Sequence, residues 1–243
     1  MDVYRATVSA DAERTLAEFP RRVEHVQALV TQHFAQRQPS AVRATLAAAA
    51  AASSGQVRGN ASLAALAAVV ADEIELVLAA LAQLSRWLQL LVPKVADGNN
   101  FGVEVQKLAL EHLKESAAGW QKHWDALAEY HSQRAAAAEK LNDKVAKEKA
   151  TSATTTATTG GKDADETKTV TMTSEKETAT TAAPVEDWAA FVVAVDVKWY
   201  FNLARTLEAV RDQYAVTFDI VEKNRDKILL PRGSSDRAAY SMF

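Results

Sequence analysis

One short stretch of this chain combines acidic, amide, aromatic and glycine residues in a pattern suited to binding. Carboxylates accept hydrogen bonds, amides both accept and donate them, and glycine adopts backbone angles that other residues resist. Exposed polar loops on a rigid scaffold commonly carry function. We therefore predict a contact loop at residues 95–104 rather than a catalytic centre. Its candidate residues are Asp97, Gly98, Asn99, Asn100, Phe101, Gly102, Val103 and Glu104.

Histidines raise the possibility of a metal site. They are His25, His33, His112, His123 and His131. A di-iron site in a helical bundle uses glutamate three residues before histidine. The residues in that place are Arg22, Val30, Ala109, Trp120 and Ala128. We therefore predict no metal and no cofactor.

The contact loop also has a partial likeness to a calcium loop. Asp97, Asn99 and Gly102 fall where such a loop places its first ligand, a second ligand and its glycine. Phe101 and Leu108, however, fall at ligand positions, and neither side chain offers an oxygen. The pattern excludes a calcium site of this type.

Enzyme chemistry finds no support in the sequence. Residues 160–163, Gly-Gly-Lys-Asp, have part of a phosphate-binding loop but lack its earlier glycine. The chain has no cysteine, and no set of serine, histidine and aspartate is spaced as a recognisable nucleophile motif. We predict no catalytic residues and a non-enzymatic protein.

Composition narrows the class of protein further. The net charge of −3 and a pI near 6.0 argue against nucleic-acid binding, which needs a concentrated basic face. The absence of cysteine excludes disulfides. The first residues lack a signal-peptide pattern, and the apolar run 76–84 is too short to span a bilayer. We expect a cytoplasmic or nuclear protein that binds neither nucleic acid nor membrane.

Apolar residues recur every three or four positions in long segments, as on one face of a helix. They predict helices over about 10–34, 63–91, 103–149 and 184–230, with a weak helix or connector near 47–52. The fold class that follows is an all-α, elongated up-down four-helix bundle. The tryptophans are expected to pack on or beside these faces. They are Trp87, Trp120, Trp124, Trp188 and Trp199.

Two segments fall outside the helices. Residues 150–183 are rich in threonine and predict a disordered linker, because they bury too little apolar surface to offset the entropy of ordering. We otherwise treat 1–149, 184–230 and the tail 231–243 as parts of a single domain. Pro231 and Gly233 release the chain from the last helix, and the tail ends in apolar residues. This tail is either a frayed end or a peptide whose carboxylate enters a partner's pocket.

Two parts of the chain resemble the 11S (REG/PA28-type) proteasome activators. The first part consists of segments 92–94, 97–103 and 105–106. The second, which follows in the same order as in that family, consists of segments 214–216, 218–220, 223–224 and 231–233. The chain is similar to a divergent, protozoan-like member. The resemblance covers residues 60–149 and 184–243 in architecture, and the N-terminal third matches only as an amphipathic helix. The threonine-rich insert departs from better-known members, which carry a lysine- and glutamate-rich insert between the first two helices.

The resemblance implies a heptameric ring that caps the 20S proteasome without ATP. Tail carboxylates would pair with lysines in pockets between α-subunits, and activation loops would push on a reverse turn of each α-subunit to open the gate. Residues 97–104 inherit the gate-opening role, with Glu104 just beyond the motif. The docking role falls on Tyr240, Ser241, Met242 and Phe243. The alternative from the helices alone is an adaptor or a bundle that binds lipid surfaces.

Overall fold

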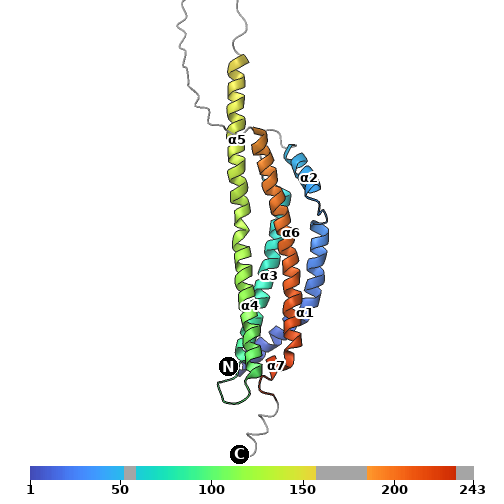
Figure 1. The fold of residues 1–243 in the computed structure, drawn as a ribbon, viewed down its shortest axis with the longest axis vertical. Coiled ribbons are helices and arrows are strands. Elements are labelled where there is room, and N and C mark those ends of the chain that lie inside the picture. The colour runs from blue at the N-terminus through green and yellow to red at the C-terminus, as the bar shows by residue number, and fades with distance from the viewer. Residues whose placement is uncertain (52–58, 157–184, 234–243) are drawn as a thin grey trace, which may run out of the picture. The chain divides into compact units, whose positions relative to one another are not determined.

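The computed structural model describes residues 1–51, 59–156 and 185–233. All regular secondary structure in these ranges is helical, which confirms the predicted all-α class (Figure 1). The helices are α1 (Asp2–His33), α2 (Pro39–Ala51), α3 (Ala61–Leu91), α4 (Phe101–Ala126), α5 (Ala128–Thr156), α6 (Val185–Lys223) and α7 (Arg225–Leu229). None of the helices within the described ranges is long and apolar enough to cross a membrane.

The chain divides into two compact units. Unit 1 contains Met1–Gln38, Asn60–Glu129 and the residues from Lys198 onward, and unit 2 contains Pro39–Gly59 and Tyr130–Val197. Two of the long helices, α5 and α6, contribute residues to both units.

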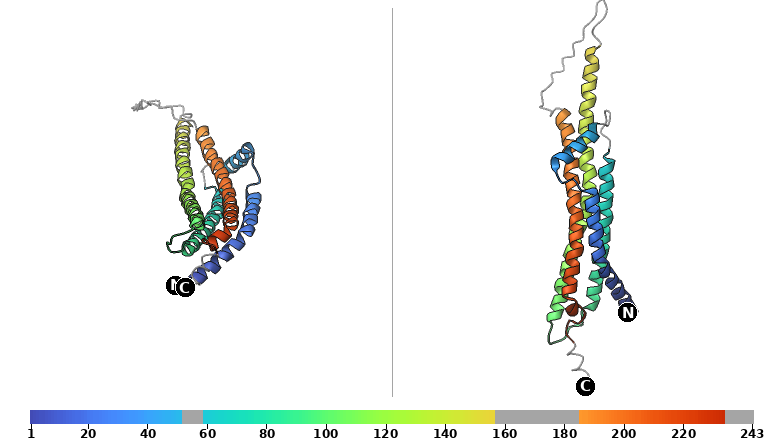
Figure 2. Two further views of the ribbon diagram at one scale, coloured as in Figure 1. Left: turned by 60° about the horizontal axis from the view of Figure 1, so that its bottom comes forward. Right: turned by 90° about the vertical axis from the view of Figure 1, so that its right-hand side faces the viewer.

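Unit 1 is an up-down bundle of α1, α3, α4 and the C-terminal part of α6. Helices α1 and α4 run in one direction and the other two run in the opposite direction, with α7 packed against the ends of α3 and α4 (Figures 1 and 2). The four-helix bundle predicted from the apolar periodicity is thus present in this unit.

The core of unit 1 follows the predicted apolar faces. Their largest fully buried side chains are Leu16, Phe19, Phe34, Leu63, Ile74, Leu81, Leu84, Trp87, Leu88, Leu113 and Tyr214. Trp120 and Trp199 are buried as well, at 5% and 7% exposure. The prediction fails at two positions of α4, because Leu108 is 65% exposed and Trp124 is 39% exposed. Spacing placed them on an apolar side, but the packing of the described helices leaves both side chains largely exposed to solvent.

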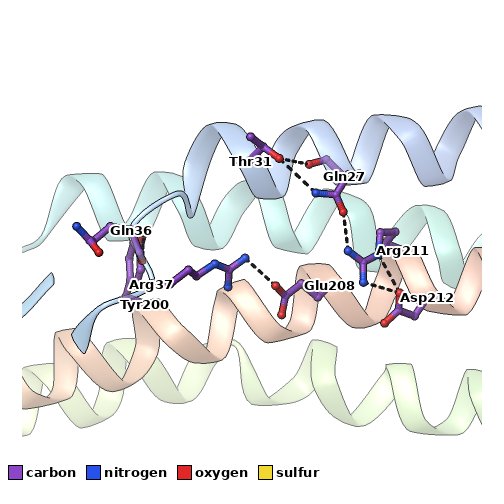
Figure 3. Close-up of polar contacts among 8 residues, drawn as sticks. All are labelled: Gln27, Thr31, Gln36, Arg37, Tyr200, Glu208, Arg211 and Asp212. Carbon is purple, nitrogen blue, oxygen red and sulfur yellow. Dashed lines mark hydrogen bonds and ion pairs between the residues drawn. The ribbon is translucent and has the colours of Figure 1, made fainter. Parts of the chain in front are cut away.

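Polar contacts tie α1 and the segment after it to α6, as Figure 3 shows. Arg37 pairs with Glu208 at 2.6 Å, and Arg211 donates to Gln27 at 2.5 Å and also pairs with Asp212. The Tyr200 hydroxyl donates to the backbone carbonyl of Gln36 at 3.3 Å. These contacts join residues far apart in sequence, so they fix the register of the two helices.

Helix ends differ from the predicted ones at several points. The predicted third helix is broken at Leu127. Its N–H donates to the carbonyl of Trp124, three residues earlier, which makes this turn tighter than an α-helical one. The fourth is broken at Asn224, whose side-chain amide donates to the carbonyl of Ile220. Residues 47–51 of the predicted weak segment belong to α2, residue 52 lies outside the described residues, and Pro20 lies inside α1.

The first residues of the predicted linker are helical, contrary to the expectation from the sequence. Helix α5 continues to Thr156, so residues 150–156 are helical. The remainder of the predicted linker, with the Gly-Gly-Lys-Asp segment, lies outside the described residues, as do the four predicted docking residues of the tail.

Unit 2 has its own small core and a buried polar group. Ala137, Leu141 and Val192 are buried together, with Trp188 packed against them. Asp196 accepts hydrogen bonds from Tyr130 at 3.2 Å and from Arg134 at 2.9 Å. Burial and the nearby Asp196 carboxylate raise the pKa of Tyr130 above its ordinary value.

Candidate functional site: the α3–α4 loop and the C-terminal turn

Helix α3 ends at Leu91, two residues before Pro93, and the loop follows. Val92, the C-cap of α3, is extended at φ −60° and ψ 119°, as expected for a residue before proline. Proline offers no N–H to continue the helix. Lys94 and Val95 then face solvent, and Val95 is fully exposed.

Local hydrogen bonds and one glycine shape the middle of the loop. Gly98 has φ +114°, which L side chains rarely adopt, so glycine is needed there. Asn99 accepts a hydrogen bond from the N–H of Phe101 at 3.1 Å, in the manner of an Asx turn. Asn100 donates through its side chain to the carbonyl of Ala96 at 3.3 Å. The loop therefore holds a specific conformation.

The end of the predicted loop is helical. Residues 101–104, which we expected in the loop, form the first turn of α4, and the N–H of Glu104 donates to the carbonyl of Asn100 at 3.0 Å. Phe101 remains 65% exposed. Glu104 is also exposed and pairs with Lys107 at 2.7 Å. The exposed surface of the site thus combines Asp97, the two asparagines, Phe101 and Glu104.

The opposite side of this turn is buried. Val103 is 8% exposed, and Gly102 and Gln106 are buried too. Gln106 donates to the carbonyl of Ile228 at 2.7 Å and approaches that of Leu91 at 3.4 Å. One amide therefore satisfies carbonyls at the ends of two other helices, which the helices themselves leave unpaired.

A tight turn follows α7. The N–H of Gly233 donates to the carbonyl of Leu230 at 3.1 Å, and Gly233 has φ +77°. Pro231 and Arg232 occupy the middle of this turn, where proline is favoured at the first central position. The turn lies at the end of the bundle where the loop lies (Figure 1).

The loop and this turn are in direct contact. A Cβ atom on Gly102 would lie 2.1 Å from the carbonyl oxygen of Pro231 and 2.6 Å from its carbonyl carbon, so only glycine fits. Arg232 donates through Nη2 to the carbonyl of Lys94 at 2.8 Å, and the same atom is 3.5 Å from Oδ1 of Asn100. We call this group the loop–turn joint. It comprises Leu91, Lys94, Asn100, Gly102, Gln106, Ile228, Pro231 and Arg232.

Sequence reasoning did not give Gln106 or Arg232 a role. Both lie in segments that carry the family resemblance, but neither is in the predicted loop or at the predicted tail tip. The sequence features that could have pointed to them are that Gln106 is a polar residue on the apolar side of a helix and that Arg232 follows a proline. Periodicity alone cannot say which backbone carbonyls such groups reach.

Within the described residues, no group of three or more histidine, aspartate or glutamate side chains is placed to hold a metal ion. The exposed side chains of the candidate site are polar and aromatic, and they lie on a loop that Arg232 and Gln106 brace.

Comparison with known proteins gives the family. The sequence model for "Proteasome activator PA28, C-terminal" matches residues 56–173 and 175–238. Proteasome activator complex subunit 3 of Homo sapiens is 27% identical over 186 residues, as is that of Gallus gallus. Each match spans 76% of this chain and 58% of the relative, so the chain covers little more than half the length of these proteins.

A solved structure supports the fold. It is the 11S subunit of the Plasmodium falciparum proteasome, PA28, which superposes with a TM-score of 0.65 at 18% identity, over 95% of this chain and 92% of that one. At that identity the likeness concerns the fold alone. The family match, which extends over most of the chain and includes the loop and the C-terminal turn, is the stronger finding. The chain belongs to the PA28 family of proteasome activators.

Proposed function

We propose that this protein is a non-enzymatic, ATP-independent activator of the 20S proteasome. One observation carries the proposal: in a chain of the PA28 family, the α3–α4 loop and the turn that starts the C-terminal tail meet at one end of the bundle. A protein that caps another particle needs the segment that docks and the loop that opens the gate on the same face. The protein is proposed to act as a homo-oligomeric ring, with seven copies, in the cytoplasm or nucleus.

The tail is proposed to bind. Residues Tyr240, Ser241, Met242 and Phe243 would enter pockets between α-subunits of the 20S particle, with the chain-terminal carboxylate paired to a pocket lysine. A single short peptide binds weakly. Several tails on one ring act as a multivalent ligand, because docking of the first raises the effective concentration of the others.

The loop is proposed to switch. A ligand shifts an equilibrium only by its differential affinity for the two states. Asp97, Asn99, Asn100, Phe101 and Glu104 would contact the open arrangement of the α-subunits better than the closed one. Local hydrogen bonds and the contact with Arg232 constrain the loop, so less ordering entropy would be lost on contact.

The primary test measures hydrolysis of a fluorogenic peptide by 20S particles with and without the purified protein, in the absence of nucleotide. Mass in solution is measured in parallel. We expect a ring near seven copies that stimulates hydrolysis. A monomer or dimer that leaves hydrolysis at its basal level and binds lipid vesicles would overturn the proposal in favour of a lipid-surface bundle.

Two variants separate the roles of tail and loop. Deletion of Met242 and Phe243 is expected to abolish complex formation. Asn100→Tyr is expected to leave binding intact and reduce peptide hydrolysis, because it removes the amide that donates to Ala96. Equal stimulation by Asn100→Tyr and the parent protein would contradict a switching role for the loop.

A further inference from the structure

The loop is anchored by a residue that belongs to neither the loop nor the tail tip. Arg232 lies in the turn after α7, more than a hundred residues along the chain from the loop. Its Nη2 atom donates to the carbonyl of Lys94 at 2.8 Å and lies 3.5 Å from Oδ1 of Asn100. Lys94 is at the entrance of the loop and Asn100 is at its exit, so one nitrogen spans both ends.

We propose that Arg232 is a positioning residue for gate opening: it clamps the two ends of the α3–α4 loop and so holds the loop in the conformation that acts on the partner. The inference rests on the proposed function for its consequence. The clamp itself is a property of this chain that can be measured without the 20S particle.

The geometry suits a clamp. Between the two ends, every residue except the partly buried Ala96 is exposed, and Gly98 lies in a backbone region that only glycine favours. Without a tie across its ends, such a segment would sample many conformations, and ordering each residue again would cost entropy on contact. A hydrogen bond from a charged donor is stronger than one between neutral groups. The Arg232 contact is therefore well placed to pre-order the loop.

The clamp can be removed without removing the fold around it. Helix α7 is held independently, because Ile228 is fully buried and Gln106 donates to its carbonyl. Gly102 packs against the backbone of Pro231, which needs no side chain from Arg232. Loss of the guanidinium is thus expected to free the loop and leave the turn in place.

The burial of Arg232 supports a specific role. The side chain is half-buried, and its Nε atom is buried without a partner among the described residues. Burying part of a guanidinium is unfavourable unless its contacts compensate. Here the contacts to Lys94 and Asn100 offset part of that cost. Both contacts are to the ends of the loop, so the role that we assign to Arg232 is to order the loop.

The test compares three full-length variants with the parent. Arg232→Met keeps the apolar stem and removes every donor. Arg232→Lys keeps a charged donor, and because both contacts come from one nitrogen, it is expected to restore part of the clamp. Arg37→Met is the matched control, since it removes an arginine that pairs with Glu208 on α6, away from the loop.

Three quantities are measured: amide hydrogen exchange of residues 94–101, co-sedimentation with 20S particles, and peptide hydrolysis at saturating activator. For Arg232→Met we expect loop exchange to rise about tenfold, the factor that corresponds to one lost charge-assisted hydrogen bond. Maximal stimulation should fall severalfold while co-sedimentation stays near that of the parent. Arg232→Lys should be intermediate, and Arg37→Met should match the parent.

The outcomes separate the two proposals. If Arg232→Met exchanges its loop amides as slowly as the parent, or stimulates as well as the parent, the positioning role is wrong. If the parent itself fails to stimulate, the proposed function is wrong, and the exchange measurement still decides whether Arg232 orders the loop. A loss of co-sedimentation in Arg232→Met would place its role in docking and overturn the inference.

Discussion

The loop–turn joint and the middle of unit 1 are held together by different kinds of contact. In the middle of the bundle, side chain meets side chain: Arg22 of α1 pairs with the buried Glu73 of α3 and lies over the ring of Tyr214, 5.6 Å from its centroid. At the joint, side chains meet backbone: Gln106 and Arg232 donate to carbonyls at the ends of helices and loops.

The difference follows from where helices end. Inside a helix every carbonyl is paired, so only side chains remain to join one helix to another. At a helix end the last carbonyls are unpaired, and an amide or guanidinium from elsewhere can satisfy them. The middle of the bundle therefore determines stability, and the joint determines the shape of a surface loop. Changes in the two regions should affect different measurements.

The largest effect on stability is expected from Arg22→Met. The substitution leaves Glu73, which is only 5% exposed, without its arginine. An uncompensated buried carboxylate costs about 3 kcal/mol in the free energy of unfolding, measured by chemical denaturation. His25, 3.5 Å from the carboxylate, offers only partial compensation.

The matched control for that variant is Lys223→Met. It breaks an exposed pair with Asp219, in which the lysine side chain is 71% exposed. The free energy of unfolding should change by less than about 0.5 kcal/mol, because exposed pairs contribute little. Similar losses in both variants would show that the middle of the bundle does not depend on the buried pair.

A smaller loss of stability, with a larger effect on the loop, is expected from Gly102→Ala. Its new Cβ would meet the backbone of Pro231, which cannot move aside as a flexible side chain would. Overpacking of this kind costs about 1–3 kcal/mol. Stimulation of the 20S particle should fall with it, because the turn is pushed away from the loop.

Gly119→Ala, on the same helix, is the paired comparison. A Cβ there meets nothing within 4 Å, so alanine should stabilise the protein by up to about 1 kcal/mol. Opposite signs for the two substitutions, measured by thermal unfolding, would confirm that Gly102 is required by contact with the turn. If both stabilise the protein, the close contact with Pro231 is absent in solution.

Alkaline pH should weaken the middle of the bundle. Burial raises the pKa of Tyr214 above its ordinary value of 10.0, although Arg22 opposes the shift. As pH rises, the Tyr214 hydroxyl therefore loses its proton in the unfolded chain at a lower pH than in the folded protein. Stability is therefore fully present below about pH 9 and falls as pH rises above about 10.

Tyr214→Phe is expected to make that fall shallower, as measured by urea denaturation at a series of pH values. Tyr130→Phe should act likewise in unit 2, since burial also raises the pKa of Tyr130. An unchanged slope in Tyr214→Phe would mean that the hydroxyl titrates in the folded protein as it does in the unfolded chain.

The smallest change in stability is expected from Glu104→Ala. Its carboxylate is 60% exposed and pairs with Lys107, so unfolding should change by less than about 0.5 kcal/mol. Stimulation of peptide hydrolysis should nevertheless fall, since Glu104 belongs to the proposed contact surface. Lys107→Ala breaks the same ion pair by removing the lysine and keeps Glu104, so it should leave stimulation unchanged. Equal effects of the two variants would show that the pair, rather than Glu104, matters.

Much of the fold could be predicted from local patterns. The apolar spacing of residues such as Leu16, Leu81 and Leu207 correctly predicted buried helix faces, because a helix brings residues three and four apart onto one side. The same reasoning failed at Leu108 and Trp124. Spacing shows that a face is apolar, but only the packing of neighbouring helices decides whether it is covered.

Helix ends were less predictable than helix faces. The breaks at Leu127 and Asn224 lie in runs that read as continuous helices. At Asn224 a side chain competes with the backbone for a carbonyl. Such local competition is decided by a few hydrogen bonds of similar energy, and periodicity has no means of weighing them.

By itself, the sequence determined the helical class, the position of the contact loop and the family resemblance, because helix periodicity, proline and glycine act over a few neighbouring residues. Only the tertiary structure decided that the loop is braced by Gln106 and Arg232 and that Gly102 contacts Pro231. These contacts join residues more than a hundred positions apart. They exist because the bundle brings the ends of separate helices to one place, and no local pattern encodes that meeting.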